Sequence, residues 1–586
     1  MKFLRNLLAA ILGCLIAFGI LFVMFFIFTA LLGSANDGVQ VKDNSILELS
    51  FSGPIYDYVG KDDSDPFASF FDEGAGLDEI LHTLEVAQQD NKIMGISLKT
   101  SFLLAGIAQS QEIRKALADF KANGKFVYAH ADFYTQKDYY LASVADSLFL
   151  TPEGAMDFKG LASEVLYYKD LQEKSGIKME VIRHGKYKSA VEPFLSDTMS
   201  DENRAQIQEL ITSLWSSLLE DISESRNISV DDLNTIADTL GARLPRYAVA
   251  SGLIDGNLYK DEYEQLLRDQ LGLGDGEKIN YVRFDDYRKV AKNKNLKSGT
   301  DKIAVIYAQG EIYYGEGDKD FIGQGSINKA LKKARENDNI KAIVLRVNSP
   351  GGNALTADLI WRELKLTKQE KPVVVSFGNL AASGGYYIGV VGDKIFAEPT
   401  TITGSIGVFG TIPNVHGLAT DIGINAEQVG TNKNSIDYSV FEPMTDAFRA
   451  TVQEGIEQTY DTFLERVAEG RGMTVADVDA VAQGRVWSGV DALRLGLVDE
   501  LGSLDDAIKA AAELADLSNY GIRKYPRYKS DFEQFMANFS SAKTAMGEAF
   551  VKEQVGDDAY RLLREFKQMT QQEGIQVRIP YSLNIK

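Results

Sequence analysis

The sequence predicts an α/β protein made of two tandem repeats with largely parallel sheets, preceded by a transmembrane helix. Three observations lead to this fold class. A stretch of the first half recurs in the second half, continuous Val/Ile runs alternate with amphipathic helical patterns, and the N-terminus holds a long uncharged apolar run. Runs that are apolar at every position are typical of strands buried on both faces, and therefore of parallel sheets with helical crossovers.

The N-terminal segment, residues 1–36, is predicted to be a cytoplasmic tip and a membrane anchor. Lys2 and Arg5 precede Leu7 to Leu32, which is 26 residues without a charge. A spanning helix needs roughly 20 apolar residues, whereas the apolar part of a cleaved signal peptide has only about 7 to 15. Because basic flanks stay in the cytoplasm, we expect a single-pass protein of the inner membrane whose other residues lie on the periplasmic, extracytoplasmic side. A long signal peptide cut near Ser34 or Ala35 is the alternative.

The two repeats are recognised by ordered matches along the chain. Tyr139 to Gly160 and Tyr386 to Gly407 share seven identical residues. Shorter matches flank them: Asp90 to Lys99 with Asp338 to Arg346, and Ser251 to Gly256 with Leu495 to Glu500. Matches in the same order along the chain indicate a duplication.

The polar, basic segment from Asp286 to Thr300 marks the junction between the repeats. We therefore expect a first repeat over 37–298, a second repeat over 299–519 and a C-terminal extension over 520–586. Phe532, Phe535 and Phe539 are spaced like one face of a docking helix in that extension.

The elements follow from the local patterns. Strands are expected at Ser45–Phe51, Ile93–Leu98, Phe126–Ala129, Lys302–Ala308, Ala342–Val347 and Pro372–Phe377, and helices over Asp201–Leu271 and Asn353–Glu370.

The composition excludes several classes of function. The net charge of −21 argues against a nucleic-acid partner, because binding the phosphate backbone requires a positive surface. Only four histidines occur, and the chain has no HExxH or CxxC pattern, so no metal site and no cofactor are expected. The single cysteine, Cys14, lies in the apolar run, which leaves no disulfide and no cysteine nucleophile elsewhere.

Three glycine-rich turns follow apolar runs in the second half: Asn348–Gly352, Ala381–Gly385 and Thr403–Gly407. Gly351 and Gly352 can turn their backbone N–H groups toward a ligand oxygen, as an oxyanion hole requires. The first half has Thr100 to Leu104 at this place and has lost both glycines.

The other two turns each offer a candidate nucleophile, Ser383 or Ser405. Phe158 replaces Ser405 in the first repeat, and Thr135 to Lys137 replace the surroundings of Ser383. Spacing alone does not separate the two serines.

A serine nucleophile needs a base. His184 and His416 lie in no motif with an orienting carboxylate, which disfavours a Ser-His-Asp triad. A neutral lysine can do the same work, provided that burial lowers its pKa by about three units from an ordinary value near 10.4. Lys188 stands beside apolar residues and two positions from Lys186, although such a lysine is more often a solvated surface residue.

Five motifs together resemble the signal peptide peptidase A (protease IV) family in its long, duplicated bacterial form. They are TGSIGVFG around Ser405, NSPGG at 348–352, AASGGYY at 381–387, GRVWSGVDALRLGLVDE at 484–500 and YKSAVEPF at 187–194. The resemblance implies the Clp-protease and crotonase fold of ββα units, Ser405 as nucleophile, and Lys188 as a general base supplied by the other repeat. It leaves Lys433 as a substitute base, and it implies bowl-shaped homo-oligomers.

The expected function is therefore that of a membrane-anchored serine endopeptidase with a Ser405–Lys188 dyad and an oxyanion hole at Gly351 and Gly352. Its expected substrates are cleaved signal peptides and other short apolar peptides outside the cytoplasm. Two alternatives remain: a crotonase-like acyl-CoA enzyme that shares the glycine turn, and a catalytically inactive membrane scaffold.

Overall fold

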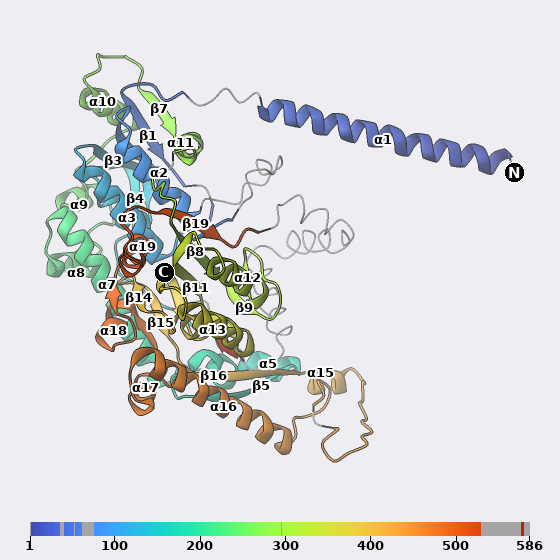
Figure 1. Cartoon of the computed structure of the whole chain (residues 1–586). Helices are drawn as coiled ribbons and strands as arrows, with labels where there is room; N and C mark the ends of the chain where they lie inside the picture. Colours follow the sequence, from blue (N-terminus) through green and yellow to red (C-terminus); the bar gives the residue numbers. More distant parts are fainter. Residues whose placement is uncertain are drawn as a thin grey trace.

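The computed structural model describes residues 2–34, 40–51, 53–60, 76–294, 296–436, 438–528 and 576–578 (Figure 1). These residues form one largely parallel sheet for each repeat and a third sheet to which both repeats contribute. The tandem α/β organisation predicted from the sequence is confirmed.

Helix α1 (Lys2–Ser34) covers the N-terminal apolar run. Over the part of the chain that the structure describes, no helix meets both the length and the apolar character that crossing a membrane requires. The transmembrane helix expected in this segment is therefore not found, and membrane anchoring stays a prediction.

The first repeat forms a sheet of six strands in the order β6-β4-β3-β2-β1-β7, and every neighbouring pair is parallel. Its strands are β1 (Ser45–Leu49), β2 (Ile93–Leu98), β3 (Phe126–Tyr134), β4 (Ser147–Met156), β6 (Gly256–Asn257) and β7 (Asn280–Arg283). Its helices are α2 (Leu77–Gln89), α3 (Ile107–Ala122), α4 (Gln136–Ala142), α5 (Lys169–Ser175), the 3₁₀ turn η1 (Ser189–Val191), α6 (Glu192–Leu195), α7 (Asp201–Arg226), α8 (Val230–Asp238), α9 (Pro245–Ala250), α10 (Lys260–Leu271) and α11 (Phe284–Lys292).

The second repeat has the same order, β18-β14-β13-β11-β8-β19, again with parallel pairs. It adds β15 beside β13, and β17 antiparallel to β15. Its strands are β8 (Lys302–Gln309), β11 (Ile340–Ser349), β13 (Val373–Ala382), β14 (Lys394–Ala397), β15 (Ile402–Gly404), β17 (Val486–Ser488), β18 (Glu500–Leu501) and β19 (Gly521–Tyr525). Its helices are α12 (Gln324–Arg335), α13 (Ala354–Lys368), α14 (Gly384–Gly389), α15 (His416–Asp421), α16 (Asp446–Arg471), α17 (Val475–Val481), α18 (Gly489–Arg494) and α19 (Leu504–Leu514).

Each repeat has its own apolar core. In the second repeat, Val344 and Val374 pack on one face of the sheet, while Ile343, Val375 and Trp361 belong to the cluster on the other face. Alternate residues of the same strands thus enter different clusters, because successive side chains point to opposite faces. This is why the sequence of these strands is apolar at every position.

The predicted boundary of the C-terminal extension precedes a strand. β19 pairs with β8 along its whole length, so residues 521–525 complete the sheet of the second repeat. The docking helix predicted around Phe532, Phe535 and Phe539 lies outside the described residues.

The third sheet joins the two repeats and has the order β10-β9-β12-β20-β16-β5. Its strands are β5 (Lys178–His184), β9 (Glu311–Tyr313), β10 (Phe321–Gly323), β12 (Gly351–Asn353), β16 (Val408–Asn414) and β20 (Gln576–Arg578). β5 of the first repeat runs antiparallel to β16 of the second, from Lys178 opposite Asn414 to His184 opposite Val408, and Figure 1 shows the two side by side. Because β5 pairs with β16 up to His184, the residues after His184 lie against the second repeat.

Candidate active site

Lys188 reaches the second repeat because of the turn that follows β5. The backbone reverses at Gly185, whose φ is +101°, and the Tyr187 N–H then donates to the Gln483 carbonyl at 2.9 Å. The Lys188 side chain is only 1% exposed. A residue of the first repeat is thus buried within the second.

The amine of Lys188 contacts both candidate serines. Its Nζ lies 2.9 Å from Ser405 Oγ, 3.0 Å from Ser383 Oγ and 3.0 Å from the Ser405 carbonyl oxygen. Burial lowers the pKa of Lys188 well below its ordinary value, and it is the one cause of that shift. A buried amine that is neutral near pH 7 can accept a proton from either hydroxyl. The structure therefore brings together Ser405 and Lys188, as the sequence predicted, and adds Ser383.

Ser383 stands at a sharp strand-to-helix turn between β13 and α14. Its φ of 55° and ψ of −117° are unusual for a residue with a side chain, and its N–H donates to the Gly404 carbonyl at 2.8 Å. The turn is packed closely against the end of β11, because a Cβ added at Gly385 would lie 2.6 Å from the Ser349 carbonyl oxygen. Strained positions of this kind are typical of functional sites.

Ser405 directly follows β15, one strand further from β11. Its φ is 51°, and its N–H donates to the Arg485 carbonyl at 2.6 Å. In the sheet order β15-β13-β11, the strand of Ser383 lies between the strand of Ser405 and the one that leads to the glycine turn.

The turn at Gly351 and Gly352 requires glycine at both positions. The two φ values are +98° and +154°, which a residue with a side chain rarely adopts, and a Cβ at Gly352 would lie 2.1 Å from the Ile312 carbonyl oxygen. The Gly351 N–H donates to Ser349 Oγ at 3.1 Å. Helix α14, which starts directly after Ser383, contacts β12.

We predict that Gly484→Ala displaces Lys188 and lowers peptidase activity by about 100-fold, since catalysis is sensitive to misplacement on the order of 1 Å. Gly484 has a φ of +81°, and an added Cβ would lie 2.7 Å from the Lys188 backbone nitrogen. Gly496→Ala is the matched control, because Gly496 also has a positive φ, of +74°, but nothing lies within 4 Å of its added Cβ. Steady-state cleavage of a peptide by the two variants tests this, and equal activities would contradict it.

In the first repeat, a carboxylate occupies the place that corresponds to the site of the second repeat. Asp138, the counterpart of Gly385, accepts hydrogen bonds from the N–H groups of Phe102 and Leu103, both at 2.9 Å. The Thr135 N–H and hydroxyl donate to the same carboxylate at 3.1 and 2.6 Å. Phe158, which stands in the first repeat where the second has Ser405, is buried against Tyr139. The sequence showed that the glycines were lost but held no sign of this role for Asp138.

We predict that Asp138→Asn destabilises the chain by about 1–3 kcal/mol, since an amide nitrogen then faces buried N–H donors. Peptidase activity should stay within about twofold of wild type, since Asp138 contacts neither the lysine nor the two serines. Chemical denaturation followed by circular dichroism, together with a peptide assay, measures both. A loss of activity without a loss of stability would contradict the structural role.

The other residues considered from the sequence do not join the site. Lys433 is exposed in the loop after α15. The His184 ring stacks on Tyr460 at 4.1 Å between centroids, and His416 Nδ1 lies 2.7 Å from the Phe441 carbonyl oxygen. A histidine triad is thus not assembled around either serine in the described part of the chain.

Comparisons with known proteins agree with the two-repeat organisation. Peptidase family S49 matches residues 119–274 and 365–518, once in each repeat. Protease 4 of Haemophilus influenzae is 38% identical over 75% of this chain and 73% of its own length. Protease 4 of Salmonella typhi is 36% identical over 89% of this chain and 88% of its own. Among solved structures, ClpP1 from Listeria monocytogenes is 17% identical and covers 34% of this chain and 92% of its own, with a TM-score of 0.23. The two family matches and the near full-length similarity to Protease 4 mean that this chain belongs to peptidase family S49.

Proposed function

We propose that the chain is a serine peptidase in which Ser405 is the nucleophile, Lys188 is the general base and Ser383 helps to hold the lysine in place. The observation that carries this proposal is the buried Lys188 amine, with both hydroxyls within 3.0 Å of its Nζ. Ser405 is also the nucleophile that the family resemblance implies.

The two distances to the amine do not separate the serines, since Ser405 Oγ lies 2.9 Å and Ser383 Oγ 3.0 Å from Lys188 Nζ. Ser405 is the serine of the TGSIG motif, to which the family resemblance assigns the nucleophile. Its φ of 51° is a strained value of the kind typical of functional sites. Ser383 then provides a second hydroxyl that orients the amine.

The chemistry follows from these positions. Neutral Lys188 takes the proton of Ser405 Oγ as that oxygen bonds to the peptide carbonyl carbon, and the carbonyl oxygen becomes an oxyanion. The carbon–nitrogen bond then breaks, and the leaving amine takes the proton from Lys188. Water attacks the acyl-enzyme ester, passes a proton to Lys188, and Ser405 Oγ leaves with that proton.

The oxyanion would be held by the N–H groups of Gly351 and Gly352. The Gly351 N–H donates to the Ser349 hydroxyl in the absence of substrate, so it has to exchange this partner for the oxyanion. A donor in such a site is worth about 100- to 1,000-fold in kcat when it is aimed at the developing charge.

The setting of the enzyme is proposed on the sequence. The uncharged run from Leu7 to Leu32 supports a single-pass anchor in the inner membrane with the peptidase outside the cytoplasm, near cleaved signal peptides and other short apolar peptides. A homo-oligomer is implied by the family resemblance alone. Alkaline extraction of membranes and sedimentation of the detergent-solubilised chain test these two points.

A direct test of the function compares three activities of the purified full chain. A peptidase cleaves an apolar peptide and reacts with a fluorophosphonate, whereas it does not turn over an acyl-CoA. Turnover of acyl-CoA without labelling would favour the crotonase-like alternative. Absence of all three activities in a folded chain would favour the inactive scaffold.

A further inference from the structure

We propose that Asp57, a residue of the first repeat, positions the glycine turn of the second repeat through Arg346 and Asn348. This inference rests on the proposed function, because it assigns a role in that reaction. It makes the first repeat a supplier of two groups: the base Lys188 and a carboxylate that orients the strand leading to the oxyanion hole.

Asp57 lies at the centre of a buried polar network beneath the end of β11. Its Oδ2 accepts from Arg346 Nε at 2.7 Å, and its Oδ1 accepts from Asn348 Nδ2 at 3.2 Å and from Gln109 Nε2 at 2.7 Å. Asp57 is 2% exposed and Arg346 1%. Arg346 and Asn348 are alternate residues of β11, and Asn348 is the first residue of the NSPGG turn. The carboxylate therefore fixes the last residues of the strand before the chain reverses at Gly351.

The network continues from Asn348 to β13, the strand that ends at Ser383, which contacts Lys188. Asn348 Oδ1 accepts from the Leu380 N–H at 3.2 Å, and Leu380 lies on β13, three residues before Ser383. The Asn348 side chain thus connects β11 to β13 where their register shifts, between Val347 and Ser349. Regular ladder bonds are interrupted at such a shift, so a side-chain bridge has more influence on the local geometry.

The segment that carries Asp57 is itself attached to the second repeat. The Tyr58 N–H donates to Gln309 Oε1 at 3.1 Å, and Gln309 Nε2 donates back to the Tyr58 carbonyl at 2.7 Å. The Tyr58 ring stacks on Tyr307 at 4.3 Å. Gly378 allows the close approach, since a Cβ there would lie 2.8 Å from Asp57 Oδ2. The position of Asp57 is thus fixed on both sides.

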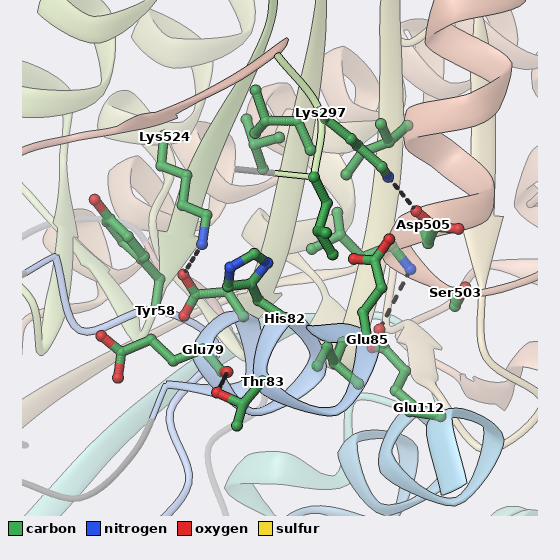
Figure 2. Close-up of a pocket in the computed structure, with 18 of the residues that line it drawn as sticks. Tyr58, Glu79, His82, Thr83, Glu85, Glu112, Lys297, Ser503, Asp505 and Lys524 are labelled. Carbon is green, nitrogen blue, oxygen red and sulfur yellow. Dashed lines mark hydrogen bonds and ion pairs between the residues drawn. The ribbon is translucent and has the colours of Figure 1, made fainter. Parts of the chain in front are cut away.

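Glu112 provides a built-in comparison. Its Oε1 accepts from Arg346 Nη2 at 2.5 Å and its Oε2 from the Leu504 N–H at 3.3 Å, so it shares Arg346 but has no bond to Asn348. Burial raises the pKa of Glu112. Glu112 lines a cavity of about 840 Å³ between the repeats. Figure 2 shows Glu112 there, together with the ion pair Lys297–Asp505. Lys524 and Asp78 form a second ion pair on the wall of this cavity. Neither serine lines this cavity.

The test compares Asp57→Asn with Glu112→Gln in the full chain. Both replace a buried carboxylate on Arg346 by an amide, but only the first sets an amide nitrogen against Asn348 Nδ2. We expect Asp57→Asn to lower kcat by about 10- to 100-fold with KM within about threefold, as for a displaced oxyanion donor. Glu112→Gln should leave kcat within about threefold. The wild-type pH profile should be kept in both variants, because Lys188 is untouched.

A reciprocal exchange makes the test specific. In Asp57→Asn/Asn348→Asp, the amide nitrogen at 57 can donate to the carboxylate at 348, which still accepts from the Leu380 N–H. We expect kcat to return to within about fivefold of wild type. Should Asp57→Asn fail to fold, Asn348→Ala removes the same link from the other side and should give the same loss of kcat at an unchanged denaturation midpoint.

Three results would overturn the proposal: equal kcat losses in Asp57→Asn and Glu112→Gln, a folded double variant that stays as slow as Asp57→Asn, or a folded Asn348→Ala with wild-type kcat. Failure of the proposed function looks different. In that case wild type itself would not be labelled by a fluorophosphonate, whereas failure of the positioning role leaves labelling of wild type intact.

Discussion

Ser405→Ala is expected to abolish peptide cleavage, with a loss of about ten thousand-fold or more, because the Ser405 hydroxyl is the proposed nucleophile beside Lys188. Ser383→Ala is expected to lose about tenfold, the equivalent of one hydrogen bond that holds the amine. The ratio of the two losses, measured as kcat on one apolar peptide, is the quantity that separates the serines.

The control for both variants is Ser110→Ala. Ser110 is also fully buried, and its hydroxyl donates to the Gly106 carbonyl at 2.9 Å in the first repeat. It reports what the loss of a buried hydroxyl costs in stability alone. The nucleophile moves to Ser383 if Ser383→Ala is the inactive variant and Ser405→Ala keeps activity.

Lys188→Met should remove activity as completely as Ser405→Ala, and Lys188→Arg should be equally inactive because a guanidinium stays protonated. In wild type, the rise of kcat/KM with pH should occur well below the ordinary lysine pKa of about 10.4. Burial, which lowers the pKa of Lys188, is the reason. An active arginine variant, or a wild-type rate that rises only near pH 10, would exclude Lys188 as the base.

Lys188→Met should also stabilise the fold at neutral pH. The folded-state pKa of Lys188 is lowered, so between that value and about 10.4 the unfolded chain binds one proton more, and wild-type stability rises with pH. Methionine at 188 removes this slope. The free energy of unfolding of Lys188→Met should therefore exceed that of wild type most at low and neutral pH, and the difference should shrink toward pH 10. A gain that does not depend on pH would contradict the depressed pKa.

The parts of the fold that depend on the periodicity of apolar residues could be predicted from the sequence. Alternating buried strands and helices, repeated once, predicted two parallel sheets, and the structure has the same strand order twice. The pairing of Lys188 with Ser405 was expected from the resemblance of the TGSIG and YKSAVEPF motifs to a known family, whereas the residue patterns alone left Ser383 and Ser405 open.

The rest depends on three-dimensional neighbours that no pattern records. Ser383 and Ser405 follow adjacent strands and both contact Lys188 Nζ, so spacing alone could not separate them. Asp57 stands in no motif, and its three hydrogen-bond donors come from α3 and β11, which are distant in sequence. The predicted boundary at 520 falls before β19 because Gly521–Tyr525 has charged residues in its middle, as an edge strand does, and carries little apolar signal.

The central claim is that Ser405 and Lys188 form a catalytic dyad across the two repeats. The most direct measurement is to label the purified full chain with a fluorophosphonate and to locate the adduct by tandem mass spectrometry of its peptides. We predict one adduct, on Ser405 Oγ, which is absent when Lys188 is replaced by methionine and is retained in Asp138→Asn. An adduct on Ser383, or one on Ser405 that forms equally fast in Lys188→Met, would contradict it.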